Sequence, residues 1–165
     1  MQATEKKIFH LSGDLPTICR IFKASGSKVV LTSGNFDLIH DGHTKYLEEA
    51  KALGDVLVVG IDNDEAIIKR KGPDRPIRNQ IDRAYVIAAF SCVDYVIVFG
   101  DYFDLVNTIA PSILVLSQTT GIGCGSLERR KKLIEGIGGK LVLLEPQSSN
   151  HSTDMITKIM KITKS

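Results

Sequence analysis

Short apolar segments alternate along the chain with longer segments in which apolar residues recur every three or four positions. The short segments are rich in Val, Ile and Leu and predict buried strands at residues 28–32, 56–61, 95–99, 113–116 and 140–144. The longer segments predict helices at residues 44–53, 64–69, 80–90, 103–109, 126–137 and 152–162. Gly54 and Gly138 follow two of these helices, where a left-handed cap favours glycine. The alternation predicts a doubly wound, Rossmann-like α/β fold: a parallel five-stranded sheet with helices on both faces.

The composition is that of one globular domain. The 165 residues are 43% apolar, and we interpret them as a single domain over 1–165, with an N-terminal extension at 1–26 and an α/β core at 28–162. Lys and Arg total 21 against 19 for Asp and Glu, which argues against a protein that binds nucleic acid. No apolar segment is long enough to predict a secretion signal or a membrane span, and three widely spaced cysteines favour a cytoplasmic protein.

Candidate chemistry is concentrated directly after the first predicted strand. His40 and His43 lie on either side of Gly42, which we expect to allow a tight turn into the following helix. Unpaired N–H groups and the helix dipole favour an anion there, so two imidazoles beside them suit phosphoryl chemistry. Two other interpretations stay open: the histidines are ordinary polar residues of a turn, or they form a metal site together with Asp37.

The composition of two later segments predicts loops. Residues 70–79, here called the basic loop, contain two prolines, one glycine and four basic residues. Residues 117–125 are rich in Thr and Gly; their glycines resemble a dinucleotide fingerprint only superficially, which leaves a dinucleotide-dependent oxidoreductase as a weak alternative. Cys124 in this segment has no basic neighbour that would activate it as a thiolate.

The sequence GNFDLIHDGH at residues 34–43 resembles the GxFDxxHxGH signature of the cytidylyltransferase-like nucleotidyltransferases. The likeness continues through LGD at 53–55, KGPDRPI at 71–77 and CVDYV at 92–96. Together these segments are most similar to the branch formed by the adenylyltransferase domains of bacterial ADP-heptose synthases. The similarity is strong over residues 28–100 and weaker beyond them.

The resemblance implies roles for individual residues. Catalysis at the nucleotide phosphates would fall to His40, His43 and Lys45. Nucleotide contacts are expected from Ser33, Gly34, Asn35, Phe36, Gly42, Lys71, Arg75, Ser152 and Thr153. Acceptor contacts are expected from Asp37, Asp62, Arg83 and Gln118. No metal ligands are expected from the protein, and Mg²⁺ would be bound through the nucleoside triphosphate.

Several of these residues also have simpler interpretations. Lys45 could be a solvated residue on the face of a helix, and Phe36 could pack in the core. Asp37 could stabilise its own turn by accepting local hydrogen bonds. Arg83 would fit a surface ion pair, for example with Asp82. Ser152 would fit an ordinary helix N-cap.

The implied reaction is transfer of a nucleoside monophosphate to a small phosphorylated acceptor, with release of pyrophosphate. ATP and a sugar 1-phosphate such as heptose 1-phosphate are favoured, and a homodimer is implied by the resemblance. A CTP-dependent enzyme acting on glycerol phosphate or another alcohol phosphate is the second possibility. The family's Lys-Gly-Gly-Asp-aromatic segment is replaced by LSQTT at 116–120, so a catalytically degenerate nucleotide-binding regulator is the third.

Overall fold

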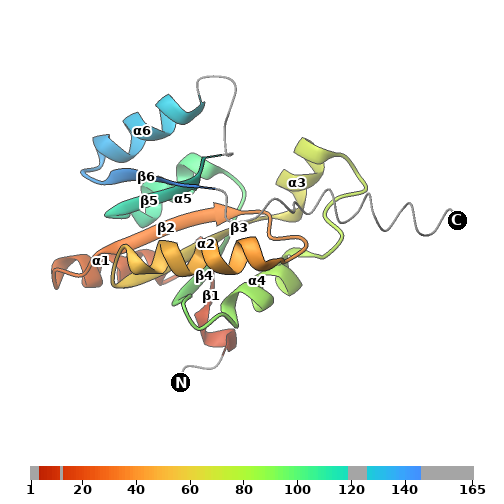
Figure 1. Ribbon diagram of the computed structural model, residues 1–165, viewed down its shortest axis with the longest axis horizontal. Helices are drawn as coiled ribbons and strands as arrows, with labels where there is room; N and C mark the ends of the chain where they lie inside the picture. Colours follow the sequence, from red (N-terminus) through yellow and green to blue (C-terminus); the bar gives the residue numbers. More distant parts are fainter. Residues whose placement is uncertain (1–3, 12, 119–125, 146–165) are drawn as a thin grey trace, which may run out of the picture.

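The computed structural model, which describes residues 4–11, 13–118 and 126–145, contains a sheet of six parallel strands (Figure 1). The strands lie in the order β1-β4-β3-β2-β5-β6. Their bounds are β1 Ile8–His10, β2 Val29–Gly34, β3 Val56–Asp62, β4 Tyr95–Phe99, β5 Ile113–Ser117 and β6 Lys140–Leu144. The expected doubly wound topology is therefore confirmed, but the expected number of five strands is wrong.

Helices cover both faces of the sheet. One face packs against α2 (Asp41–Ala52) and α4 (Gln80–Ala88), and the other packs against α1 (Leu15–Ala24), α5 (Tyr102–Ile109) and α6 (Ser126–Gly136). A short helix, α3 (Asp64–Lys71), follows β3, and a 3₁₀ turn, η1 (Thr4–Lys7), precedes β1. Within the ranges described, none of the helices is long and apolar enough to cross a membrane.

The sixth strand, β1, comes from the segment before residue 28, where we expected no element. It has three residues and lacks a long apolar run, and it becomes a strand by pairing in parallel with Val96, Ile97 and Val98 of β4. Helix α1 was also missed, although Leu15, Ile18 and Phe22 follow a helical period and Pro16 suits a first turn. The helix expected at 152–162 lies outside the described residues.

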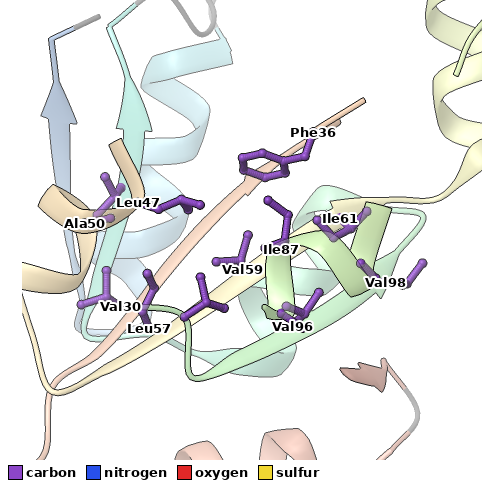
Figure 2. Packing of buried hydrophobic residues seen from close by; sticks show 14 of the residues in the cluster. Val30, Phe36, Leu47, Ala50, Leu57, Val59, Ile61, Ile87, Val96 and Val98 are labelled. Atoms are coloured by element: carbon purple, nitrogen blue, oxygen red, sulfur yellow. The ribbon is translucent and has the colours of Figure 1, made fainter. Parts of the chain in front are cut away.

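The core lies on both sides of the central strands. All seven residues of β3 are buried, and alternate residues face opposite layers. Figure 2 shows one layer, in which Leu47 and Ala50 of α2 and Ile87 of α4 cover strand residues such as Val59. This packing fixes the position of α2, whose first turn carries the candidate histidines.

The two glycines expected as left-handed helix caps behave differently. Gly138, after α6, has φ +79° and fits that expectation. Gly54, after α2, does not have a positive φ, so the prediction for it is wrong. Glycine is needed there because a Cβ atom would lie 2.6 Å from a methyl group of Val30 and 2.7 Å from the Lys28 carbonyl. The close approach lets the chain turn directly into β3.

Candidate active site

The carboxyl ends of β2 and β5 are where the topology of this sheet favours a ligand site. The chain adds β3 and β4 on one side of β2 and returns to place β5 on the other, so a topological switch point lies between β2 and β5. Tyr46 of α2 spans this point: its hydroxyl lies 2.6 Å from Thr32 Oγ1 and donates to the Val115 carbonyl at 3.2 Å. Burial raises the pKa of Tyr46 to about 12, so it holds the two strands as a neutral phenol.

His40 and His43 meet at the first turn of α2, the helix that follows β2 in the chain. Their ring centroids are 3.9 Å apart, and the backbone N–H of His40 donates to Nδ1 of His43 at 3.4 Å. Because Nδ1 accepts a hydrogen bond, a neutral His43 carries its proton on Nε2. The pair therefore occupies the helix end at which unpaired N–H groups and the dipole favour an anion.

The start of α2 differs in detail from the expectation. The helix begins at Asp41 rather than Thr44, and His40 is its N-cap residue. Gly42 therefore lies inside the first turn, buried, and is not among the residues with positive φ. The tight turn expected at Gly42 is wrong, and the left-handed backbone residue before the helix is Phe36.

Phe36 has φ +49°, a left-handed conformation that non-glycine residues rarely adopt. Its ring is 5% exposed, belongs to the core cluster, and lies 5.3 Å from the ring of His43. Gly34, at the end of β2 after Ser33, has no Cβ atom, and one placed there would lie 3.1 Å from the Phe36 ring. The core packing expected as an alternative role for Phe36 is confirmed, and the strained residue fixes the loop against the histidines.

The carboxylate of Asp37 binds the basic loop through backbone and side-chain contacts. Its carboxylate is almost fully buried and accepts the backbone N–H groups of Ile77 and Arg78, each at 3.0 Å. Its Oδ2 also lies 3.0 Å from Nε of Arg75. Asp37 therefore braces a loop forty residues away rather than its own turn, and it places Arg75 beside the Gly34–Asp37 segment.

Arg83 is the organising residue of this edge. Its side chain is 0% exposed, which rules out the surface ion pair considered for it. The guanidinium donates to the Arg78 carbonyl (2.9 Å), the Asn35 carbonyl (2.6 Å), the Asp62 carbonyl (2.8 Å) and the Asp64 carboxylate (2.6 Å). Four of its five N–H groups are used in this way, which leaves one on Nη1.

A third set of contacts surrounds the end of β3. Arg70 Nη2 lies 3.1 Å from Asp62 Oδ2 and donates to the Asn35 side-chain oxygen at 2.7 Å. Lys71 is the last residue of α3, and its pKa is lowered chiefly by desolvation and then by the charges of Arg75 and Arg70. Its surroundings therefore already disfavour a cation before any anion is bound.

The remaining candidates are more scattered. Lys45 is on the exposed side of α2, 3.4 Å from Asp41 in an i,i+4 pair, which matches its simpler interpretation as a solvated residue. Gln118 is exposed after β5, and its backbone N–H donates to the Leu144 carbonyl. Ser152, Thr153 and Cys124 lie outside the described residues. In the described part of the chain, no three His, Cys, Asp or Glu side chains are grouped so that they could hold a metal ion.

Three contributors to the site were not among the expected residues. Arg70 was expected only as part of the basic loop, Tyr46 only as part of the helix at 44–53, and Asp64 only as the start of a helix. Asp64 and Gln80 cap each other's helices, since each backbone N–H donates to the other side chain at 3.0 and 3.1 Å. Polar residues at two neighbouring helix starts were a usable signal for this pair.

The fold and the site together define a Rossmann-like α/β protein with a cationic site at the carboxyl edge of its sheet. A family model described as cytidylyltransferase-like matches residues 31–158, and the chain belongs to this family. The resemblance inferred from residues 34–43 is thereby confirmed.

Curated relatives of this chain include bifunctional HldE proteins. The bifunctional protein HldE of Syntrophotalea carbinolica is 37% identical over 156 residues, which cover 91% of this chain and 30% of that protein. HldE of Helicobacter pylori is 45% identical over 117 residues, which cover 70% of this chain and 24% of that protein. The chain thus spans about a third or less of the length of these relatives.

Two solved structures share the fold. A lipopolysaccharide core biosynthesis protein of Thermoplasma volcanium aligns with TM-score 0.61 and 28% identity, over 76% of this chain and all of that chain. A pantoate-beta-alanine ligase of Francisella tularensis aligns with TM-score 0.62 and 17% identity, over 96% of this chain and 79% of that chain. The second likeness concerns the fold alone.

Proposed function

We propose that this chain is a nucleotidyltransferase that transfers AMP from ATP to a sugar 1-phosphate such as heptose 1-phosphate. A phosphate oxygen of the acceptor attacks the α-phosphorus, the bond to the β-phosphate oxygen breaks, and pyrophosphate leaves. The observation that carries the proposal is the close pair of His40 and His43 at the first turn of α2, with ring centroids 3.9 Å apart. The 37–45% identity to HldE proteins supports the choice of acceptor.

The two imidazoles would act by donating hydrogen bonds to phosphate oxygens as negative charge moves toward pyrophosphate. His43 would donate through Nε2, because its Nδ1 accepts from the backbone N–H of His40. Lys71 and Arg75 would contact the triphosphate from the basic loop, and Lys45 would approach it from α2. Nucleotide contacts are assigned to the Ser33–Phe36 segment, Gly42, Ser152 and Thr153.

Acceptor contacts are assigned to Asp62, Gln118 and the remaining N–H of Arg83. The other bonds of Arg83, and those of Asp37, make both residues positioning groups as well. We further propose that the reaction takes place in the cytoplasm, where the two described free thiols, Cys19 and Cys92, would stay reduced.

Mg²⁺ suits this site through the nucleotide rather than through a protein cage. Two carboxylates beside the basic loop, those of Asp37 and Asp62, are paired with Arg75 and Arg70. Mg²⁺ is commonly held by phosphate oxygens and water, and bound in that way it offsets triphosphate charge. Lys71 and Arg75 would complete the neutralisation from the protein side.

The test is pyrophosphate release from ATP and from CTP with Mg²⁺, across sugar 1-phosphates and polyol phosphates. His43→Ala should lose most of the activity while it keeps the circular dichroism spectrum of the wild type. His10→Ala is the matched control, since His10 is an exposed histidine on the edge strand β1. Wild-type turnover in His43→Ala would refute the proposed role of the pair.

The same panel separates the alternatives. Release with CTP and glycerol phosphate only would identify a cytidylyltransferase. Nucleotide binding without release for any acceptor would favour a regulator, for which the altered segment at 116–120 is the specific reason.

A further inference from the structure

A tyrosine and an arginine on neighbouring helices have polar groups that no described residue satisfies. The hydroxyl of Tyr102, the first residue of α5, is buried and has no hydrogen-bond partner within the described ranges. The guanidinium carbon of Arg130 in α6 lies 4.3 Å from the centre of the Tyr102 ring, and its N–H groups have no acceptor in the same part of the chain. Because buried polar groups are rarely left unpaired, the unused hydroxyl points to a partner that comes from outside the fold.

Both residues lie at the carboxyl edge of the sheet. Tyr102 follows the end of β4, and Arg130 is in the second turn of α6, the helix that follows β5. Helices α5 and α6 are neighbours on the face of the sheet opposite to α2 (Figure 1). Burial is the main cause of the raised pKa of Tyr46, and the nearby Tyr102 phenol adds to it. Since Tyr46 spans the switch point, the Tyr102–Arg130 pair borders that point from the face opposite to the histidines.

We propose that Tyr102 and Arg130 bind the second substrate, the phosphorylated sugar, through its oxygen atoms; this inference rests on the proposed function. On that function, the triphosphate is contacted from α2 and from the basic loop. An in-line displacement places the attacking oxygen opposite the leaving pyrophosphate. The acceptor therefore has to approach from another side than the triphosphate, and the pair is on the other face of the switch point.

The unused groups of the pair suit an oxygen-rich ligand better than a nucleobase. Arg130 covers one face of the Tyr102 ring, and the Phe103 ring packs edge-to-face against it with centroids 5.7 Å apart. Burial raises the pKa of Tyr102 to about 12 although Arg130 opposes the shift, so the phenol stays protonated and can donate. The pair thus offers a hydroxyl and guanidinium N–H donors, which match the oxygens of a sugar phosphate.

Arg130 also supplies a charge that the chain before it lacks. Residues 113–127 contain no charged side chain, so neither β5 nor the segment after it offers a cation to the acceptor. An anionic acceptor that approaches a triphosphate is repelled by it unless a nearby cation offsets the charge. Arg130 is partly buried and forms no ion pair with any described residue, so its charge is available for this.

Calorimetric titration of the full chain with heptose 1-phosphate, and with the other sugar 1-phosphates of the panel, tests the subsite without any assay of turnover. The wild type should bind one of them, and Arg130→Gln should bind it roughly ten- to a hundredfold more weakly, because a charged hydrogen bond is lost. Arg129→Gln is the matched control and should bind like the wild type, since Arg129 lies 5.1 Å from the centre of Phe103, a ring without a hydroxyl. A wild type that binds no sugar phosphate, or an Arg130→Gln variant with wild-type affinity, would overturn the proposal.

Thermal melts test whether the Tyr102 hydroxyl serves a ligand or the fold. An unpaired buried hydroxyl is costly, so Tyr102→Phe should have a Tm no lower than that of the wild type. Its affinity for the sugar phosphate should nevertheless fall several-fold. Tyr46→Phe, which loses contacts to Thr32 and Val115, should melt below the wild type. If Tyr102→Phe loses as much Tm as Tyr46→Phe does, the hydroxyl supports the fold and the assignment is wrong.

Kinetics separate this inference from the proposed function. Arg130→Gln should raise the KM for the acceptor roughly tenfold or more and change the KM for ATP by less than about twofold. An equal rise in both KM values would place the pair at the nucleotide and contradict its assignment to the acceptor. If no acceptor supports turnover in the wild type, the proposed function fails, whereas an affinity for the sugar phosphate that depends on Arg130 would still support the subsite.

Discussion

Replacing Arg83 should lower the free energy of unfolding far more than replacing an exposed arginine on a helix would. Arg83→Met keeps the length of the side chain but removes all four hydrogen bonds that it donates to Asn35, Asp62, Asp64 and Arg78. Three of the acceptors are backbone carbonyls that would lose a charged donor. Removing one member of a buried ion pair generally costs about 3–5 kcal/mol.

The structure places the expected loss at the lower end of that range. The Asp64 side chain is 33% exposed, so water can replace the guanidinium there. We therefore expect about 3 kcal/mol less unfolding free energy, within the 5–15 kcal/mol that domains commonly have. For a chain of this length that is a fall in Tm of roughly 6–12 °C. Arg83→Lys should fall between the two proteins, since one ammonium cannot reach acceptors in four directions.

Urea denaturation followed by circular dichroism measures this loss, with Arg20→Met as the control. Arg20 is an exposed arginine on α1 whose guanidinium donates to Thr17 at 3.1 Å, so its replacement should change stability by less than about 0.5 kcal/mol. If Arg83→Met is as stable as Arg20→Met, the buried network does not hold this edge together and the reasoning is refuted. If it is destabilised as expected, nucleotide binding should weaken too, because the Asn35 carbonyl loses its anchor.

Two further predictions concern Lys71 and Tyr46. Desolvation and the nearby Arg75 lower the pKa of Lys71, and a bound triphosphate would raise that pKa. Nucleotide binding at alkaline pH should therefore be accompanied by uptake of a proton on Lys71. The affinity should weaken as the pH rises through the pKa that Lys71 has in the free protein. Calorimetry in buffers of different ionisation enthalpy measures the uptake, which should vanish in Lys71→Arg while binding remains; an unchanged uptake would contradict the assignment. Tyr46→Phe should cost about 1–2 kcal/mol of unfolding free energy, because the Val115 carbonyl loses its donor. Tyr85→Phe, at an exposed tyrosine, should cost almost nothing in the same urea titration, and equal losses would show that the Tyr46 contacts do not matter.

The strands were predictable where burial dictates composition. β3 and β4 are bounded within a residue of the expectation, because strands buried on both faces are continuous apolar runs that no exposed element resembles. β1 has three residues and one neighbour, so its sequence carries too little pattern to predict it. It forms because the edge of β4 is available for backbone pairing, which is an interaction between segments far apart in the sequence.

The place of the histidines between β2 and α2 was also predictable from the apolar run before them and the helical pattern after them, although the helix begins at Asp41 rather than Thr44. The partners of the site's charged residues were not. Asp37 meets backbone groups forty residues later in the chain, and Arg83 reaches three separate segments. An arginine on a helix next to an aspartate has the pattern of a surface residue, and only the folded arrangement of carbonyls around it makes full burial favourable.

The charges at this edge of the sheet have different functions despite their common sign. Arg70 and Arg75 each lie within 3.1 Å of a carboxylate, and the guanidinium of Arg83 is surrounded by acceptors, three of which are backbone carbonyls. Lys71 is different, because its surroundings lower its pKa rather than stabilise its charge. An arriving phosphate would therefore gain most from Lys71, while the arginines keep the loop in the shape that presents it. Lys71→Ala should therefore lower the affinity for the nucleotide without lowering the free energy of unfolding, whereas Arg83→Met should lower both.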